Sequence, residues 1–520
     1  MNLPIGYEGF KDLRGDQCYY VDKTDLIYKM ITSGRHYFLS RPRRFGKSLL
    51  VSTLECLFEG KKELFKGLYI EDKWTWSTKY PVVRFSFTDR NRYTDSLDNT
   101  IGDQLLDYEE EHGLDPSGRS SPQGRFRRLV KHLHRKTGQQ VVVLVDEYDA
   151  PILDVLTDTD LVKKNSDDLK DFYRVFKNCS KHIRFVFVTG ISMFSKDTVF
   201  SGLNNLNDIS LHQSYATICG YTDNDLDTVF AEEVKKLDRN KIKRWYNGYN
   251  WLGEEKVYNP FGILNLFDKK KFKGWWIDTG APQYLYKYLN ALSTLSIEKM
   301  ENYWIDSRDI STFNVDRLVP QALLFQSGYL TIAKEKHVGR KTKYLLKSPN
   351  LEVRDSVYDW LLKFLTNEDE EKEKEAITNG KQMLNFMEKN DFDGLENKMQ
   401  AFFASIPYQL NKSENHESDY HKLIYAILYG ASVEFNAEQP THLGASDITI
   451  LYKGQIFIIE FKMQQSSQTI DKALQNAIQQ IKDRRYADQH KGYKGPIHIL
   501  GIVFNKEERN VVGIRHEKLK

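Results

Sequence analysis

Short apolar runs separated by long stretches of helical composition set the fold class of the first half of this 520-residue chain. Consecutive runs lie too far apart to be joined by hairpins, and parallel strands need long crossover connections that are usually helical. The pattern therefore predicts an α/β fold in which helices flank a parallel sheet. The four runs are HYFLS (36–40), PVVRFSFTD (81–89), VVVLVDE (141–147) and RFVFVTG (184–190).

The composition is that of a soluble folded protein, with 40% hydrophobic and 28% charged residues. The net charge is only +3, so any binding of nucleic acid must come from local basic patches. The four cysteines show no CxxC spacing, which argues against a zinc site or a disulfide framework and favours a reducing compartment. No segment approaches the roughly 18 apolar residues of a membrane helix, so we expect a cytoplasmic protein without membrane contact.

Changes of composition divide the chain into four parts. We expect a parallel-sheet domain over 1–225 and a helical and winged-helix-like segment over 226–365, the latter ending in a helix, strand, strand, helix pattern. The charge-dense run NEDEEKEKEA lies near the start of a predicted charged helical linker, 366–410. A second α/β domain is predicted over 411–520. Its expected elements are a helix (417–430), strands (433–436, 446–452, 456–462), a helix (469–487) and a strand (496–504).

The segment RPRRFGKSLL (41–50) follows the first predicted strand directly and opens a helix, which is where a phosphate-binding loop lies. Gly46 lets the backbone approach a phosphate, Lys47 can reach the β and γ oxygens, and Ser48 can bind Mg²⁺. The usual GxxxxGK[ST] pattern requires glycine where this chain has Arg41, so the loop alone is an imperfect match. The candidate nucleotide-binding residues of the loop are Arg43, Arg44, Phe45, Gly46, Lys47, Ser48 and Leu49.

The ends of two later strands supply the other groups that ATP hydrolysis needs. In VVVLVDEYDAP, Asp146 is placed to hold Mg²⁺ and Glu147 to orient or deprotonate the attacking water. Thr189 ends the next strand, where its hydroxyl either senses the γ-phosphate or caps a loop. Asp149 is interpreted as a carboxylate that caps a turn. Together these strand ends predict a site for ATP and Mg²⁺.

The arginines of the loop have two interpretations that the sequence leaves open. Arg41, Arg43 and Arg44 can contact phosphates or act as arginine fingers. They can equally form a basic cluster that is solvated or has a structural role.

A second constellation lies in HLGASDITILYKGQIFIIEFKM, near the C-terminus. If Lys453 and Gly454 form a two-residue hairpin turn, Asp447 faces Glu460 across the two strands. Like charges that face each other destabilise a sheet unless a cation lies between them. Alternation along the strand also places Lys462 on the same face as Glu460.

Two carboxylates and an ammonium in this arrangement suit metal-dependent phosphodiester hydrolysis. Asp447 and Glu460 would bind Mg²⁺ or Mn²⁺, and Lys462 would orient water and stabilise developing negative charge. The alternative is an edge hairpin whose Glu460 and Lys462 form an ordinary surface ion pair. A third carboxylate comes from Glu438 or Glu434, and the spacing does not choose between them.

Seven motifs together resemble the predicted AAA-type ATPases of bacteria and archaea: YVDKTDLI, RPRRFGKSLL, VDEYDAP, TGISMFSK, SGLNNLNDI, WYNGYNW and VYNPFGIL. In that family RPRRFGKS is the typical form of the loop, so the resemblance removes the objection from Arg41. It implies that Lys47, Ser48, Asp146 and Glu147 are the Walker elements of a P-loop NTPase fold.

Members of that family commonly carry a C-terminal PD-(D/E)xK nuclease domain, and GASDITI with IIEFKM resembles its motif at Asp447, Glu460 and Lys462. The resemblance implies that Glu438 is the acidic residue before the motif. It also implies that Gln480 and Tyr486 are the familial glutamine and tyrosine of the next helix. Ala445 and Ser446 stand where relatives often have glycine and arginine. A substrate-contacting arginine is therefore not expected there.

Two functions fit these residues. In the first, ATP binding and hydrolysis control a Mg²⁺-dependent nuclease that cleaves DNA or RNA, which the resemblance associates with defence or mobile elements. In the second, the chain is a nucleotide-dependent switch whose nuclease-like domain binds a protein or nucleic acid without cutting it. A homo-oligomer, including a ring-shaped motor, is left open.

Overall fold

The computed structural model forms two compact units, one built by the described residues of Met1–Ala291 and Met300–Arg354 and the other by those of Asp355–Lys520. No helix in the described ranges is long and apolar enough to cross a membrane. The structure describes residues 1–88, 96–115, 121–193, 199–200, 203, 205–276, 303–311, 319–366, 369–405, 424–428, 430–431, 435–440 and 445–520.

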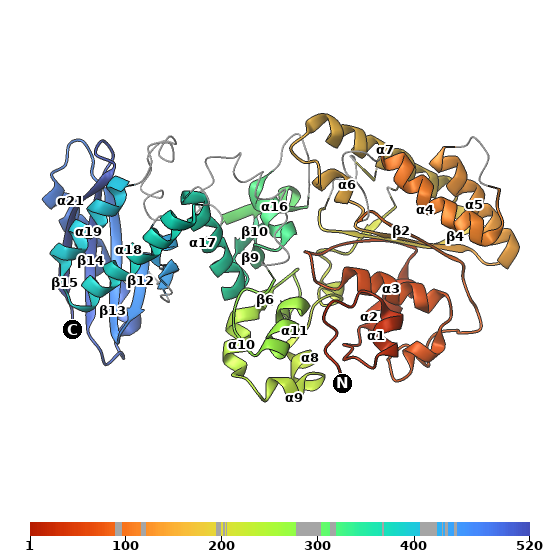
Figure 1. The fold of residues 1–520 in the computed structure, drawn as a ribbon, viewed down its shortest axis with the longest axis horizontal. Coiled ribbons are helices and arrows are strands. Elements are labelled where there is room, and N and C mark those ends of the chain that lie inside the picture. The colour runs from red at the N-terminus through yellow and green to blue at the C-terminus, as the bar shows by residue number, and fades with distance from the viewer. Residues whose placement is uncertain are drawn as a thin grey trace. The chain divides into compact units, whose positions relative to one another are not determined.

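A five-stranded parallel sheet forms the centre of the first unit, which confirms the fold class predicted from the apolar runs (Figure 1). Strand β3 (Val141–Asp146) is buried along its whole length, as its unbroken apolar run requires for a strand covered on both faces. The strand order is β2 (Val82–Ser86), β3 (Val141–Asp146), β4 (Ile183–Gly190), β1 (His36–Ser40) and β5 (Asn207–Asp208).

Helices cover both faces of this sheet, with α1 to α3 on one side and α4, α5 and α7 on the other (Figure 1). Ser96, Ser121 and Asp158 each accept a hydrogen bond from the first turn of the helix that follows, which fixes where α4, α5 and α7 begin. The helices are α1 (Phe10–Gly15), α2 (Thr24–Ser33), α3 (Lys47–Phe58), α4 (Leu97–His112), α5 (Pro122–Thr137), α6 (Ala150–Leu153) and α7 (Thr159–Asn178).

The rest of the first unit is a small helical segment followed by a module of helices and a three-stranded antiparallel sheet. Buried aromatic and aliphatic side chains, among them Phe230, Ile242 and Phe267, form the core of the helical segment. The module adds a strand, β8, that the sequence did not predict, and its sheet is antiparallel in the order β8-β10-β9. These elements are α8 (Asp223–Thr228), α9 (Ala231–Val234), α10 (Arg239–Tyr246), β6 (Asn247–Tyr249), β7 (Val257–Tyr258), α11 (Pro260–Lys269), β8 (Tyr303–Asp306), α15 (Ser307–Ile310), α16 (Pro320–Ser327), β9 (Thr331–Val338), β10 (Lys341–Lys347) and the first turn of α17 (Leu351–Leu365), a helix that continues into the second unit.

The second unit is a five-stranded mixed sheet in the order β11-β12-β13-β14-β15. Strands β13 and β14 are parallel and are joined through α21, whose apolar side packs on them with Ile478 and Ile481. The elements are α18 (Glu370–Glu388), α19 (Phe392–Ser405), β11 (Phe435–Pro440), β12 (Ala445–Tyr452), β13 (Gln455–Met463), α21 (Ile470–Asp483), β14 (Ile497–Asn505) and β15 (Asn510–Lys518).

Two features of this unit differ from the sequence-based expectation. Helices α18 and α19 occupy the predicted linker, yet they belong to the second unit, and Glu396 of α19 accepts a hydrogen bond from Ile514 N of β15 at 2.7 Å. Strand β15 itself was not predicted. Of the expected helix over 417–430, only 424–428 and 430 are described, and they are helical.

The hairpin of β12 and β13 has the predicted register. Lys453 and Gly454 form the turn with φ of 47° and 76°, and the pairs run from Tyr452 with Gln455 to Ile448 with Ile459. Two positive φ values in succession are the mark of the tight hairpin turn that matches the strand twist. This turn therefore determines which residues of β12 and β13 face each other.

All four cysteines are free and buried. Burial raises the pKa of the Cys56 thiol to about 11. Burial also raises the pKa of the thiols of Cys179 and Cys219.

Replacing the turn glycine should weaken the hairpin. We expect Gly454→Ala to destabilise β12 and β13 by about 1 kcal/mol, because a Cβ is unfavourable in the left-handed conformation. Gly492→Ala is the matched control, since no heavy atom lies within 4 Å of the added Cβ and its φ is not positive. The measurement is amide hydrogen exchange of the β12 and β13 peptides. Equal protection in the two variants would contradict the role assigned to the turn.

Candidate functional site

The loop between β1 and α3 exposes the N-terminal end of a helix. Gly46 precedes α3 with φ +92°, a left-handed conformation that favours glycine. No side chain of the described residues caps this turn, so its free N–H groups and the positive end of the helix dipole can receive an anion. The backbone therefore has the geometry of a phosphate-binding loop.

A cavity of about 420 Å³ opens beside this loop. Every residue from Arg43 to Leu50 lines it, so the predicted candidates from Arg43 to Leu49 come together in one place. Tyr19, Tyr221 and Phe261 also line the cavity and give it aromatic surface. Our reasoning from the sequence missed these three residues, because they come from distant segments that share no local pattern.

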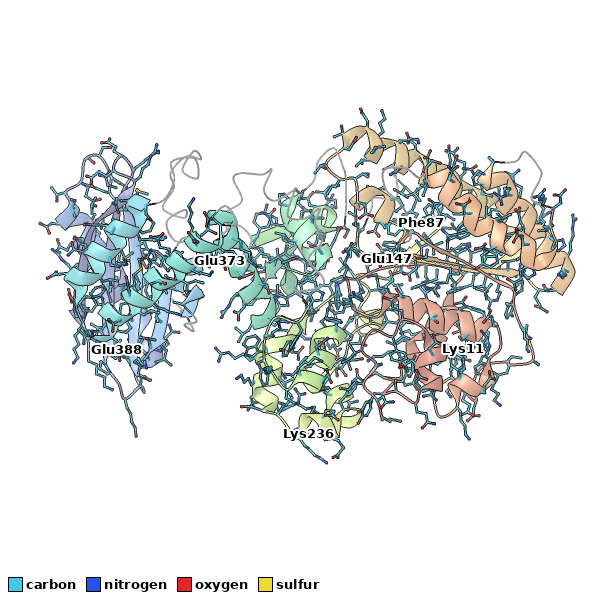
Figure 2. All side chains as sticks on the ribbon, viewed as in Figure 1. Lys11, Phe87, Glu147, Lys236, Glu373 and Glu388 are labelled. Atoms are coloured by element: carbon cyan, nitrogen blue, oxygen red, sulfur yellow. The ribbon has the colours of Figure 1, made fainter. Side chains whose placement is uncertain are left out.

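Lys47 and Glu147 reach the cavity from different elements. Lys47 is 5% exposed, and its Nζ donates a hydrogen bond to the Pro42 carbonyl oxygen at 3.1 Å. Glu147 follows β3, and Figure 2 shows it near Phe87, the residue after β2. Burial raises the pKa of the Glu147 carboxyl, and the nearby charge of Lys47 partly offsets that rise. A carboxyl of this kind can exchange a proton closer to neutral pH than an ordinary glutamate can.

Asp146 is the last residue of β3 and is only 3% exposed. Its Oδ2 lies 3.5 Å from Nη2 of Arg84, while its Oδ1 is buried and has no hydrogen-bond partner among the described residues. A buried carboxylate oxygen without a donor is unfavourable unless a cation or a water completes its surroundings. Asp146 and the hydroxyl of Ser48 are oxygen donors of the type that Mg²⁺ prefers, so these residues fit that ion.

Two polar residues at the strand ends bind the protein's own backbone. The Thr189 hydroxyl is buried and donates to the Leu39 carbonyl oxygen at 2.7 Å, and Thr189 does not line the cavity. Asp149 accepts hydrogen bonds from the backbone N–H groups of Ile191 (3.0 Å) and Ser192 (2.5 Å). The Asp149 side chain makes no capping hydrogen bond to its own turn at the start of α6, so the interpretation as a turn cap is wrong, and the carboxylate instead holds the segment that follows β4.

Arg41 occupies the position where the usual pattern has glycine, and it contacts neither solvent nor the cavity. The side chain is 1% exposed and donates to the carbonyl oxygens of Ser40 and Ser210 at 2.8 Å and of Tyr215 at 3.2 Å. Its guanidinium carbon lies 4.2 Å from the centre of the Trp251 ring. Burial lowers the pKa of Arg41 to about 10. This guanidinium holds the start of the loop in place, which is a structural role rather than a contact with phosphate or solvent.

Aromatic residues of the helical segment hold the rest of the loop. The Phe45 ring is buried and packs edge-on against the rings of Tyr249 and Trp251. The Trp276 indole N–H donates to the Arg43 carbonyl oxygen at 3.1 Å. The motif WYNGYNW therefore supports the loop by packing, which its local sequence pattern could not show.

The carboxylates of the C-terminal hairpin meet as the register predicts. Asp447 Oδ2 accepts a hydrogen bond from the backbone N–H of Phe461 at 2.7 Å, which places it beside Glu460. Lys462 Nζ lies 3.0 Å from Oε1 of Glu460. Glu460 is 1% exposed, so this ion pair is not an ordinary surface pair.

Two further residues complete the surroundings of Glu460. Gln480, on α21, donates a hydrogen bond to the same Oε1 atom that Lys462 contacts. Burial raises the pKa of Tyr486, the negative charges of Glu460 and Asp447 add to that rise, and a hydrogen bond with Gln480 opposes it. The structure therefore brings together Gln480 and Tyr486, the two residues that the resemblance implied.

Glu438 lies on β11 at the register position opposite Asp447, between the pairs Ala437 with Ile448 and Gln439 with Ser446. The positions of Glu438, Asp447 and Glu460 thus form one row across three neighbouring strands. The side chain of Glu438 lies outside the described residues, as does the rival Glu434.

No group of three or more acidic, histidine or cysteine side chains that could hold a metal occurs among the residues searched, which do not include the Glu438 side chain. Asp447, which is half-buried, and Glu460, which is buried, supply hard carboxylate oxygens at this position. This donor chemistry fits Mg²⁺ or Mn²⁺.

Comparisons with known proteins also place the two candidate sites in two different domains. A family model described as predicted AAA-ATPase matches residues 4–200, and one described as PD-(D/E)XK nuclease superfamily matches residues 415–513. The chain is 40% identical over 523 residues to an uncharacterized protein in the vnfD 5′ region of Azotobacter chroococcum mcd 1, covering 99% of each chain.

Among solved structures, the chain is similar to the ORC1 protein of Aeropyrum pernix in complex with DNA. The sequence identity is 12%, and the match covers 66% of this chain and 93% of the other. The TM-score is 0.26, which is too low to treat the two as sharing one overall fold.

Removal of the buried guanidinium should destabilise the first unit, although Arg41 does not line the cavity. We expect Arg41→Ala to lower the free energy of unfolding by about 3 kcal/mol, because buried carbonyl oxygens lose their donors. Thermal unfolding followed by tryptophan fluorescence measures the effect, since Trp251 packs on Arg41.

Arg44→Gln is the matched control for this experiment. The Arg44 side chain is 41% exposed, and its contact with Glu8 is long, at 3.9 Å. We expect a change of less than about 0.5 kcal/mol. Similar losses in the two variants would show that Arg41 has no special structural role.

Proposed function

Because the chain belongs to the family of predicted AAA-ATPases and carries a C-terminal domain of the PD-(D/E)XK nuclease superfamily, we propose that it binds and hydrolyses ATP and uses this reaction to control a Mg²⁺-dependent nuclease. The observation that carries the proposal is the grouping of Asp447, Glu460 and Lys462 at one hairpin, in the same chain as the loop-lined cavity.

In the first unit, we infer that the free N–H groups at the start of α3 bind the phosphates of ATP. Lys47 would exchange its contact with the Pro42 carbonyl oxygen for phosphate oxygens. Ser48 and Asp146 would hold Mg²⁺, which supplies positive charge to the phosphates when bound. Glu147, whose pKa burial raises, would orient the attacking water and accept its proton.

Aromatic residues in the lining of the cavity suit the base of the nucleotide. Tyr19, Tyr221 and Phe261 line it, and aromatic rings can stack on a purine. The base would then contact two parts of the first unit at once, the N-terminal segment and the helical segment. Nucleotide binding would therefore hold these two parts together.

In the second unit, Asp447 and Glu460 would hold Mg²⁺ or Mn²⁺, which supplies a Lewis acid for attack on a phosphodiester. Gln480 keeps the Glu460 carboxylate in a fixed orientation. The Lys462 ammonium, 3.0 Å from that carboxylate, would stabilise the negative charge that develops on the phosphate.

Contacts of α17 support the proposed control. Glu352, near the start of α17, is fully buried and accepts a hydrogen bond from the Trp276 backbone N–H at 2.7 Å. The Trp276 indole in turn binds the Arg43 carbonyl oxygen of the nucleotide loop. From Asp355 onward, α17 belongs to the second unit. A movement of the loop could thus reach the helix that continues into the nuclease-like unit.

Loss of the proposed base should separate ATP binding from hydrolysis. We expect Glu147→Gln to bind ATP like the unaltered protein but to hydrolyse it about 100-fold more slowly or worse. Lys47→Ala should lose binding itself, and Glu63→Gln, at an exposed position, should change neither quantity. Fluorescent-nucleotide binding and phosphate release are the measurements.

The pH profile gives a second readout for Glu147. Because burial raises the pKa of this carboxyl, hydrolysis should decline as the pH falls toward the raised value, where protonation removes the base. Full hydrolysis by Glu147→Gln, or a profile that the substitution leaves unchanged, would assign the base role to another residue.

Cleavage should depend on the hairpin carboxylates. We expect the purified protein with Mg²⁺ or Mn²⁺ to cut plasmid, single-stranded DNA or RNA, and we expect Asp447→Asn to reduce cutting by at least about 100-fold. Asp471→Asn is the control, since the Asp471 side chain is 86% exposed. EDTA should abolish cutting, and reactions with and without ATP give the direction of control.

If the protein hydrolyses ATP but cuts none of these substrates, the nuclease proposal is wrong. The alternative function then takes its place, in which the nucleotide state switches binding of a partner by a non-cutting nuclease-like domain.

A further inference from the structure

The hairpin of β9 and β10 carries a basic face that the two proposed sites do not use. Strand β9 is buried only at Thr331 and Ile332, and its residues from 333 to 338 are exposed. Lys341, at the start of β10, is exposed as well. The outer part of this hairpin therefore presents its side chains to solvent.

The strand register places four lysines on one face of the hairpin. Lys343 pairs with Lys336, Lys341 pairs with Val338, and Leu345 pairs with Lys334. Residues directly opposite each other, and residues two apart along a strand, share a face. Lys334, Lys336, Lys341 and Lys343 are thus neighbours, and we call this group the lysine face.

The pairing of Lys336 with Lys343 is unfavourable in the isolated protein. Like charges directly opposite each other destabilise an antiparallel sheet. None of the four lysines forms an ion pair with a residue that the structure describes. An anion bound over the face would relieve this repulsion.

The neighbouring groups that the structure describes do not neutralise the positive charge of the lysine face, so this charge can attract an anion. The Lys336 ammonium lies 3.7 Å from the centre of the Trp304 ring, on β8, which holds it on this face without neutralising it. Asp306, opposite Lys343, accepts hydrogen bonds from the backbone N–H of Arg308 at 3.0 Å and from its guanidinium at 3.2 Å. This carboxylate is therefore already engaged by an arginine.

We propose that the lysine face binds the phosphodiester backbone of nucleic acid. Lysine is depleted in protein-protein interfaces, whereas lysine and arginine supply most contacts to phosphates. The preference for nucleic acid over an acidic protein rests on the proposed nuclease function. The lysine face lies in the first unit, apart from the carboxylate hairpin in sequence and in fold. It binds without regard to base sequence, because its side chains reach phosphates and carry no base-reading amide.

The test compares binding by the full chain and by a variant in which both facing lysines are neutral, Lys336→Gln with Lys343→Gln. The probes are a fluorescently labelled single-stranded DNA and the corresponding duplex, in EDTA so that no cutting occurs. Anisotropy is measured over a series of sodium chloride concentrations. Lys11→Gln with Lys62→Gln is the matched control, because both lysines are exposed on the first unit and carry the same charge.

We expect the lysine-face variant to bind about tenfold more weakly than the unaltered protein at low salt. The slope of log affinity against log salt should fall by about 1.4 on single strands and by about 1.8 on duplex, the contribution of two lost phosphate contacts. The control variant should match the unaltered protein. Melting curves of all three proteins show whether the substitutions left the fold intact.

Equal affinity and equal salt slope for the lysine-face variant and the unaltered protein would overturn the proposal, as would the absence of binding to both probes. A loss of the same size in the control variant would also overturn it, since the effect would then come from net charge alone. Because no cutting is measured, failure of the nuclease proposal does not change these outcomes.

Discussion

The burial of one guanidinium controls the geometry of the nucleotide-binding half of this protein. Arg41 donates to carbonyl oxygens that come from the end of β1, from the segment after β5 and from the turn at Tyr215, and it stacks on Trp251. The next residues along the chain form the loop that lines the cavity. A glycine at this position could not make these hydrogen bonds. The arginine therefore fixes the backbone at the start of the loop.

In both candidate sites, a carboxylate is buried away from water and can be stabilised further by a bound cation. Asp146 and Glu460 are almost fully buried, and each lies beside one basic side chain, Arg84 or Lys462. Desolvation makes such arrangements unfavourable in an empty protein and strengthens the attraction of a cation. The rigid parallel sheet and the hairpin with a fixed turn provide the stiffness that holds these groups in place.

The sequence predicted those parts of the molecule that depend on neighbouring residues. The four strands of the first sheet and the register around Lys453 and Gly454 follow from local apolar patterns and turn chemistry. Contacts between distant segments had no such signal, which is why the partners of Arg41, the strand β15 and the packing of α19 were not predicted. The hydrogen bond of the Thr189 hydroxyl was not predicted for the same reason, because its partner, the Leu39 carbonyl oxygen, lies on a strand that is distant in the sequence.

The four buried thiols have a consequence for how opening of this molecule can be observed. A thiol reacts as the thiolate, and the raised pKa of Cys56 keeps it protonated near neutral pH. Three of the cysteines come from different layers around the parallel sheet: Cys56 on α3, Cys179 after α7 and Cys219 next to the cavity wall. Their alkylation rates would therefore report, layer by layer, how often each part of the core becomes accessible to solvent.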